Sequence, residues 1–310
     1  MVASWPPAAL AARLGPHLEG EAVTDDGTRL RWQSFGAGPA VLFANGIGVR
    51  YPGATAQIEA LRGSYRVLCW DYRGLGDSRL ARPDADLTMA RHAADAVAVL
   101  DAAGVDRAAW IGWSMGVQVG LEAVRRAPDR VAALVALLGT YGQPFRTAFP
   151  GKVGHLVEGV FAASLHAPWV AQAALDLAVG LPTIAFHLLS TFAFIGADVD
   201  RTIFDGNVRS VATAERRTYL RQLLELARHD AADVLPAVRC PTLVVCGARD
   251  WLTPPKVARR MADGIPGAIY HEIPRATHFG LIEQTEHVNR LLGDFLASAF
   301  VRRAVAGASP

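Results

Sequence analysis

The feature that most constrains the fold is a regular alternation between short, continuously apolar runs and segments of helical periodicity. The apolar runs in the first half of the chain occupy residues 39–45, 65–71, 107–113 and 131–139. The helical segments between them occupy residues 52–63, 88–104 and 114–128. Strands that are apolar on both faces are typical of a parallel sheet with helices on each side. The pattern therefore predicts the α/β class, with a mostly parallel central sheet covered by helices on both faces.

The alternation lapses between about residues 143 and 232, where the sequence has helical patterns and many aromatic residues but no convincing strand. It then resumes with two further strand-like runs and two further helical segments, at residues 241–247, 254–264, 268–274 and 280–300. We therefore predict a core in two parts, residues 1–142 and 233–300, with a helical cap at 143–232 inserted between core strands. Residues 301–310 are expected to form a flexible tail.

Composition excludes some classes of partner. The 310 residues carry 31 basic and 29 acidic side chains, a formal net charge of +2, with no block of like charge. A nucleic-acid partner is therefore not expected. The three cysteines, Cys69, Cys240 and Cys246, form no CxxC pair and no Cys/His cluster with zinc-ligand spacing. We expect no metal site and interpret the cysteines as small buried side chains in a reducing compartment.

Two segments bear on localisation. The N-terminus lacks the basic region of a secretory signal and is interrupted by Pro6, Pro7 and Pro16, so we expect a cytoplasmic protein. Residues 177–197 carry no formal charge when His187 is neutral, and they are long enough to span a bilayer. However, a proline and several polar residues within this stretch, and aspartates at its edges, fit a hydrocarbon core poorly. We expect no transmembrane span and favour a buried or pocket-lining insert, with peripheral membrane contact as the alternative.

Residues 112–116, Gly-Trp-Ser-Met-Gly, follow a strand-like run and open a helical segment. They match G-x-S-x-G, the nucleophile elbow, in which a sharp turn from strand to helix exposes a serine hydroxyl and needs small neighbours. The letters alone recur by chance, and their position between a strand and a helix gives them weight. The alternative is a serine that caps a helix. We interpret Ser114 as a candidate nucleophile.

A serine nucleophile needs a base, and a histidine at the carboxyl end of the sheet is the best placed. Of the nine histidines, His278 directly follows the last strand-like run and precedes the final helical segment. His271 lies inside that run and is interpreted as packed. The insert contributes His155, His166 and His187, which are candidates for a pocket lining.

The base needs an orienting carboxylate. Asp250 follows the first strand-like run after the insert, and prolines after it begin the next helical segment. An aspartate that caps a turn is the alternative, and Asp230 and Asp233 are rivals that do not follow a strand. The chain order Ser114, Asp250, His278 is the order that a serine elbow on an α/β sheet uses. We therefore predict that these residues form the catalytic triad.

Backbone N–H groups are the expected donors to a developing oxyanion. One donor is expected at Met115, directly after the serine. The second is assigned to Ile47, in the loop that follows the first apolar run, because the glycines of this loop let the backbone turn its amides toward a ligand. Asn45 and Gly46 are expected to support the loop. The third glycine and the lysine of nucleotide-binding loops are lacking here.

Five motifs together resemble the α/β-hydrolase fold of the capped type over roughly residues 20–300. They are NGIG at 45–48, DYRGLGDS at 71–78, GWSMG at 112–116, GARD at 247–250 and ATHF at 276–279. Many relatives have a histidine at the position of Asn45, and an asparagine can still hold the loop by hydrogen bonding. NGIG also resembles the corresponding loop of intracellular polyhydroxyalkanoate depolymerases, but one tetrapeptide does not define a substrate. The serine at the elbow argues against epoxide hydrolases and haloalkane dehalogenases, which use aspartate there.

The resemblance implies a serine hydrolase of the esterase and lipase type that works through an acyl-enzyme, without a metal or other cofactor. The aromatic and aliphatic insert is expected to form a pocket for a small ester with an apolar acyl or aromatic group. The same triad is also compatible with carbon–carbon bond hydrolysis, acyl transfer or perhydrolysis. A non-catalytic ligand-binding member of the fold and an insert that docks a membrane or partner are the alternatives from other classes. Sequence alone defines neither the physiological substrate nor the oligomeric state.

Overall fold

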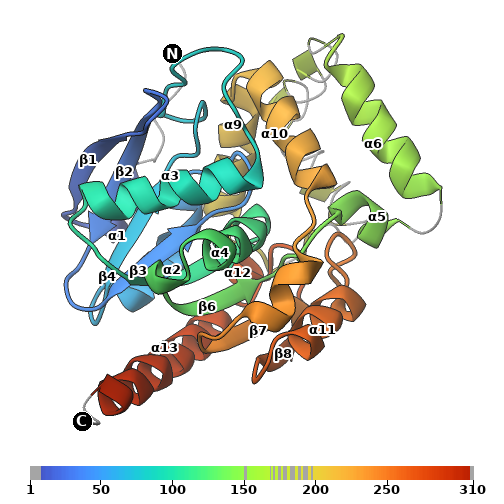
Figure 1. Cartoon of the computed structure of the whole chain (residues 1–310). Coiled ribbons are helices and arrows are strands. Elements are labelled where there is room, and N and C mark those ends of the chain that lie inside the picture. The colour runs from blue at the N-terminus through green and yellow to red at the C-terminus, as the bar shows by residue number, and fades with distance from the viewer. Residues whose placement is uncertain are drawn as a thin grey trace.

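The computed structural model describes residues 8–149, 152–167, 169, 172–173, 176, 180–181, 186–187, 190, 195–196 and 198–307. Within these residues eight strands form one sheet in the order β1-β2-β4-β3-β5-β6-β7-β8 (Figure 1). The strands are β1 (Leu18–Val23), β2 (Arg29–Phe35), β3 (Ala40–Ala44), β4 (Arg66–Trp70), β5 (Ala108–Trp113), β6 (Val131–Leu137), β7 (Thr242–Gly247) and β8 (Ile269–Ile273). Only the β1–β2 and β2–β4 pairs are antiparallel among the pairs described. The mostly parallel sheet predicted from the apolar runs is confirmed.

Helices cover both faces of the sheet, as predicted. One face packs against α3 (Met89–Ala102), α4 (Met115–Arg126) and α11 (Pro255–Gly264), and the other against α1 (Ala8–Leu14), α2 (Thr55–Leu61) and α13 (Thr285–Gly307). Strand β3 shows why its sequence is continuously apolar. Leu42 and Ala44 belong to the first core and Val41 and Phe43 to the second, because alternate side chains of a strand point to opposite faces.

The end of the chain differs from the prediction. A single helix was expected over residues 280–300, but the structure has α12 (Gly280–Glu283) and then α13, which continues to Gly307. Gln284 separates the two helices with a non-helical backbone, φ −118° and ψ 45°. The final helix therefore runs past residue 300 into the segment expected to be a tail. The break after Glu283 turns the chain directly beside the loop that carries His278.

The stretch predicted as the cap contains α5 (Pro144–Ala148), α6 (Val153–Ser164), α9 (Arg201–Thr213) and α10 (Arg216–Arg228). Figure 1 shows α6 and α10 side by side. Within this stretch, residues 150–151 and much of 168–197 lie outside the described residues. Three short 3-10 helices complete the described elements: η1 (Tyr51–Ala54), η2 (Pro128–Arg130) and η3 (Ala232–Ala237).

The chain enters and leaves this helical stretch at adjacent points. Gln143 N donates to His229 O at 2.9 Å, and Ala231 N donates to Tyr141 O at 3.0 Å. The His229 ring also reaches core helix α4, with Nε2 3.0 Å from Glu122 Oε1. The two ends of the helical stretch are thus tied to each other and to the core.

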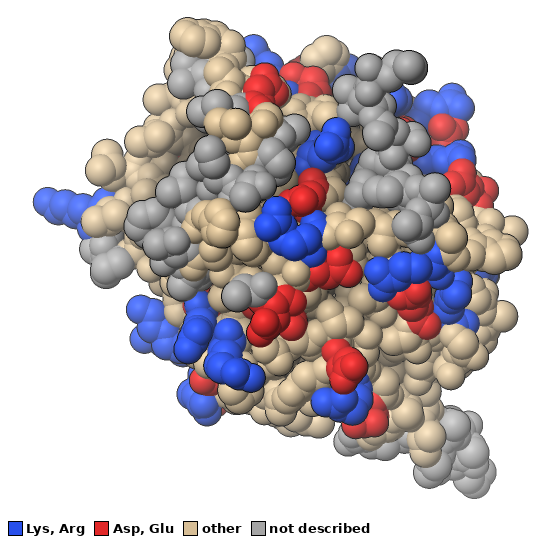
Figure 2. Space-filling model, turned by 180° about the vertical axis from the view of Figure 1, so that it is seen from behind, with Lys and Arg blue, Asp and Glu red and all other residues tan. Residues whose placement is uncertain are grey.

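Surface and helix properties bear on the membrane question. No helix within the described ranges is both long and apolar enough to cross a membrane. Most of residues 177–197, which prompted the question, lie outside those ranges. Figure 2 shows basic and acidic side chains interspersed on the face it presents, which accords with the small net charge of +2.

Candidate active site

Ser114 lies in a sharp turn between β5 and α4. Its backbone has φ 55° and ψ −114°, a region that non-glycine residues rarely adopt and that is typical of strained functional turns. The two flanking glycines are required by close backbone contacts. A Cβ on Gly112 would lie 2.2 Å from Gly116 O, and a Cβ on Gly116 would lie 2.1 Å from Ala44 O of β3. The G-x-S-x-G spacing therefore lets strand, turn and helix pack directly against β3.

The structure brings Ser114, Asp250 and His278 together. Ser114 Oγ lies 2.9 Å from His278 Nε2, and Asp250 Oδ2 lies 2.9 Å from His278 Nδ1. The three residues follow β5, β7 and β8, so all lie at the carboxyl edge of the parallel strands. Asp250 is 2% exposed and His278 8%, whereas Ser114 is half-buried. The arrangement places a shielded carboxylate and imidazole behind a serine that remains accessible.

Thr253 supports the carboxylate of Asp250. Its backbone N donates to Asp250 Oδ1 at 2.8 Å, and its Oγ1 donates to Oδ2 at 2.6 Å. Asp250 therefore caps a local turn and contacts His278 at the same time, so the two alternatives left open by the sequence coexist. Sequence reasoning missed Thr253, although an aspartate followed three residues later by threonine is a signal for a side-chain-capped turn.

The loop that carries His278 is held from two sides. Trp113, the residue before Ser114, donates from Nε1 to His278 O at 3.3 Å. On the other side, Thr277 donates from its backbone N and its Oγ1 to the carboxylate of Glu283, at 2.8 and 2.5 Å. These contacts were not predicted from the sequence. No local pattern marks a pair between Thr277 in the loop and Glu283 at the end of the short helix α12.

The predicted oxyanion loop lies against the elbow. A Cβ on Gly46 would lie 3.4 Å from Ser114 Cβ, and a turn is closed by Val49 N donating to Gly46 O at 3.1 Å. Gly48, directly after Ile47, has φ +72°, a left-handed conformation that favours glycine. Met115 is the first residue of α4, so its amide belongs to the unsatisfied N-terminal turn of that helix.

Asn45 supports this loop differently from the expectation. Its backbone carbonyl accepts a hydrogen bond from Tyr72 Oη at 2.7 Å. The side-chain Nδ2 and Oδ1 are buried and have no hydrogen-bond partner among the described residues. The loop is thus held through the main chain and a tyrosine hydroxyl. The asparagine amide, expected to hold the loop by hydrogen bonding, makes no such bond to the described residues.

The cap helices contact the far side of the same loop. Ser210 of α9 donates from Oγ to Gly48 O at 2.8 Å. A Cβ on Gly48 would lie 2.8 Å from Cε2 of Tyr219, on α10. Sequence reasoning did not single out Ser210 or Tyr219, because a loop–helix contact across more than 160 positions leaves no local signature.

Aromatic side chains extend from the triad toward the cap. The ring centroids of His278 and Phe279 are 6.0 Å apart, and Phe279 packs edge-on against Phe204 of α9 at 5.3 Å. Phe204 in turn lies 6.2 Å from Phe186. This row gives the surroundings of the histidine an apolar side.

The rival residues have other partners. His271 points head-on at His287, with their Nε2 atoms 3.0 Å apart, and burial together with the neighbouring His287 lowers its pKa. Asp230 accepts from Gln143 Nε2 at 3.1 Å, and Asp233 pairs with Arg125 at 2.6 Å. The three insert histidines, His155, His166 and His187, are all exposed.

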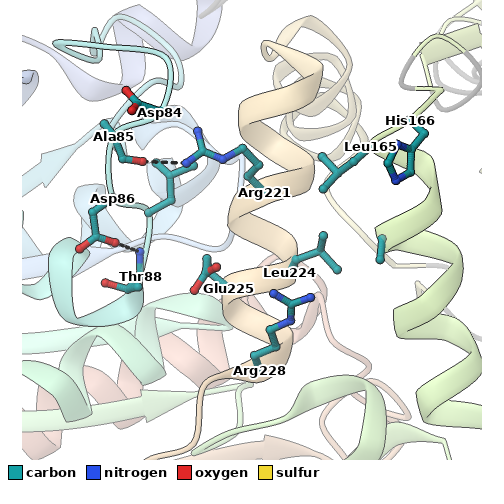
Figure 3. Close-up of a pocket in the computed structure, with 12 residues that line it drawn as sticks. Asp84, Ala85, Asp86, Thr88, Leu165, His166, Arg221, Leu224, Glu225 and Arg228 are labelled. Atoms are coloured by element: carbon teal, nitrogen blue, oxygen red, sulfur yellow. Dashed lines mark hydrogen bonds between the residues drawn. The ribbon is translucent and has the colours of Figure 1, made fainter.

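A cavity of 390 Å³ has a lining that includes none of the triad residues, and Figure 3 draws the residues that line it. It lies between residues 84–88, the end of α6 and helix α10, where Arg221 donates to Ala85 O. Charged side chains of both signs line this cavity, namely Asp84, Asp86, Arg221, Glu225 and Arg228.

The described residues show no group of three or more His, Cys, Asp or Glu side chains that could hold a metal ion. All three cysteines lie in this part of the chain and are free; Cys69 and Cys246 are buried and Cys240 is half-buried. Burial raises the pKa of the Cys246 thiol to about 11, with a smaller opposing effect from Tyr270.

Comparison with known proteins identifies the family of the chain. The model of the α/β hydrolase fold family matches residues 39–285. The chain is 29% identical over 264 residues to the "Putative carbamate hydrolase RutD" of Klebsiella pneumoniae strain 342, covering 84% of this chain and 92% of that one. It is 30% identical to the pimeloyl-[acyl-carrier protein] methyl ester esterase of Methylococcus capsulatus, covering 86% and 98%. A solved hydrolase from Pseudomonas aeruginosa superposes with a TM-score of 0.73 at 24% identity, covering 90% and 98%.

Proposed function

The chain belongs to the α/β hydrolase fold family of hydrolases, and we propose that it is a serine esterase for small esters with apolar acyl or aromatic groups. The observation that carries the proposal is the unbroken contact chain from Ser114 Oγ through the His278 ring to Asp250, with both steps at 2.9 Å. A nucleophile, a base and an orienting acid in hydrogen-bond reach are the recurring parts of covalent acyl transfer.

In the proposed mechanism His278 Nε2 takes the proton of Ser114 as the oxygen attacks the ester carbonyl. Asp250 accepts from Nδ1–H, holds the ring in the correct tautomer and stabilises the imidazolium that forms. The imidazolium then protonates the leaving alcohol, and an acyl-enzyme remains on Ser114. Water, deprotonated by the same imidazole, attacks this ester and releases the acid.

The negative charge of each tetrahedral intermediate is assigned to the backbone amides of Ile47 and Met115. Met115 N–H opens α4, so the positive end of the helix dipole favours an anion there. The turn at Gly46 and Gly48 brings the Ile47 segment against the elbow. Removing one donor of this kind typically costs about 10²–10³-fold in kcat.

The substrate class is inferred from the surroundings of the histidine. Phe279 and Phe204 form an apolar side next to the His278 ring. A curated relative that is 30% identical is named as a methyl ester esterase, which supports an ester bond as the scissile group. An acyl chain or aromatic ring against the half-buried Phe279 would gain from burial of apolar surface.

The test is a series of p-nitrophenyl esters from acetate to dodecanoate, with charged and sugar esters for comparison. We expect the highest kcat/KM among the uncharged apolar esters, and Ser114→Ala to lower turnover by about 10⁴-fold or more. Full activity of Ser114→Ala, or a clear preference for charged or sugar esters, would contradict the proposal. A matched p-nitrophenyl carbamate tests the other bond type, because a relative that is 29% identical is named as a putative carbamate hydrolase. Faster turnover of the carbamate than of the esters would point to that bond.

A further inference from the structure

The carboxylate of Glu283 joins the loop of His278 to the cap. Oε1 accepts hydrogen bonds from Thr277 Oγ1 at 2.5 Å and from Gly196 N at 2.6 Å. Oε2 accepts one from Thr277 N at 2.8 Å. Thr277 directly precedes His278, whereas Gly196 belongs to the stretch predicted as the cap. One side chain therefore ties a cap amide to the residue next to the proposed base.

A second set of contacts runs alongside. Asp200 N, at the start of α9, donates to Ile282 O at 3.0 Å. The Phe204 ring of the same helix packs against Phe279, which directly follows His278. The segment 279–283 directly follows His278 in the chain and contacts the stretch predicted as the cap. Main-chain and side-chain contacts together therefore join the stretch predicted as the cap to this segment.

The three hydrogen bonds that reach this side chain explain why a glutamate suits position 283. An ionised carboxylate is an acceptor with two oxygens, so it satisfies three donors at once, whereas an amide offers one acceptor oxygen and places an NH₂ group against the other donors. Hydrogen bonds to a charged acceptor are also shorter and stronger than those between neutral groups. Glutamine at this position would lose at least one of the three bonds.

We propose that Glu283 is a positioning residue, which sets the orientation of the His278 imidazole toward Ser114 and makes it depend on the position of the cap. The inference rests on the proposed esterase function, since it assigns a role in the same reaction. Glu283 acts through Thr277 and not on the substrate. Its loss therefore lowers kcat and leaves KM nearly unchanged, because misplacement of a catalytic group by about 1 Å can cost up to about 10²-fold.

The first experiment compares Glu283→Gln with Glu286→Gln, using kcat and KM for the best p-nitrophenyl ester. Glu286 is a matched control on the next turn, with a side chain 93% exposed and a long ion pair to Arg290 at 3.8 Å. We expect Glu283→Gln to lower kcat by about tenfold or more with KM within about twofold, and Glu286→Gln to match the wild type.

Two further variants test the contacts on either side of the carboxylate. Thr277→Val removes the hydroxyl donor and should lower kcat. Thr277→Ser keeps the hydroxyl and should have a kcat close to that of the wild type. In the cap, a Cβ on Gly196 would lie 3.0 Å from Glu283 Cδ, so Gly196→Ala pushes the carboxylate. We expect Gly196→Ala to lower kcat several-fold in the wild type and to add little in Glu283→Gln, because the two changes act on one contact.

The outcomes separate the two proposals. A wild type that neither turns over esters nor reacts with a serine-directed probe at Ser114 overturns the esterase function, and the positioning role falls with it. An active wild type with a folded Glu283→Gln of unchanged kcat, or with lowered stability alone, overturns the positioning role only. Where Glu283→Gln does not fold, Thr277→Val and Gly196→Ala decide: reduced kcat at constant KM supports the role, and wild-type kcat in both contradicts it.

Discussion

The core and the cap contribute to the candidate active site through different kinds of contact. In the core, Ser114 is held by the backbone: β5, β3 and α4 approach so closely that only glycine fits at residues 112 and 116. In the cap, single polar side chains reach the site, such as Ser210, which donates to Gly48 O of the predicted oxyanion loop at 2.8 Å. The comparison suggests that the core fixes the chemistry, while the cap adjusts it. Changes in the core should therefore have larger effects than changes in the cap.

The largest effect is expected for Asp250→Asn in the core. The asparagine keeps the size of the side chain but offers an NH₂ group to His278 or to Thr253, so the imidazole loses its preferred tautomer. We expect kcat to fall by about 10⁴-fold, with the unfolding midpoint in urea little changed. Asp233→Asn, at an exposed rival position, is the control. A loss below about tenfold at Asp250 would point to another acid.

The next prediction compares a glycine-to-alanine substitution in the core with one in the cap. Gly116→Ala places a Cβ 2.1 Å from Ala44 O, so we expect a loss of about 1–3 kcal/mol in the free energy of unfolding and a large fall in turnover. In cap helix α6, a Cβ on Gly159 would meet no atom of the described residues within 4 Å. Gly159→Ala should stabilise the chain by up to about 1 kcal/mol without loss of turnover. Urea unfolding measures both, and equal effects would erase the distinction between the regions.

A smaller effect is expected at the cap contact to the oxyanion loop. Ser210→Ala removes one hydrogen bond to Gly48 O, and we expect kcat to fall by up to about tenfold, in line with about 0.5–1.5 kcal/mol for one such bond. Thr213→Ala is the matched control, because among the described residues its hydroxyl bonds only to carbonyls of its own helix, Arg209 O and Ser210 O. Unchanged kcat in Ser210→Ala would show that the cap does not support the loop.

The smallest expected effect is a pH dependence of stability at Glu122 of α4, which contacts His229 at the end of the cap stretch. Burial alone would raise the pKa of Glu122, but hydrogen bonds from His229 and Arg126 outweigh it and lower the pKa from 4.5 to about 2. Because the pKa is lower in the folded state, the stabilisation is complete above the unfolded value and is lost as the pH falls from 4.5 toward 2. We expect the urea midpoint of Glu122→Gln to depend less on pH in that window than that of the wild type. Parallel curves for the two proteins would contradict this assignment.

The sequence predicts the features of the core but not the contacts that the cap makes with it. The sheet, its covering helices and the convergence of Ser114, Asp250 and His278 follow from local patterns, because parallel strands place their carboxyl ends at one edge. The glycines at 112 and 116 carry a signal for the same reason: they serve contacts between neighbouring elements of a repeating pattern.

Two of the contacts that sequence reasoning missed join distant segments through single side chains. Ser210 reaches Gly48 and Glu283 reaches Gly196, and no motif includes Ser210, Glu283 or Gly196. The buried amide of Asn45 was expected to bond within its loop, but the hydroxyl of Tyr72 takes that role at the main-chain carbonyl. Such pairings depend on how the cap sits on the core, which local propensity does not encode.

The most direct test of the central claim is labelling with an organophosphonate probe followed by peptide mapping. The account predicts one adduct, on the peptide that contains Ser114, formed rapidly in the wild type and lost in Ser114→Ala and strongly slowed in His278→Ala. An adduct at another residue, or equal labelling of wild type and Ser114→Ala, would contradict activation of this serine by the triad.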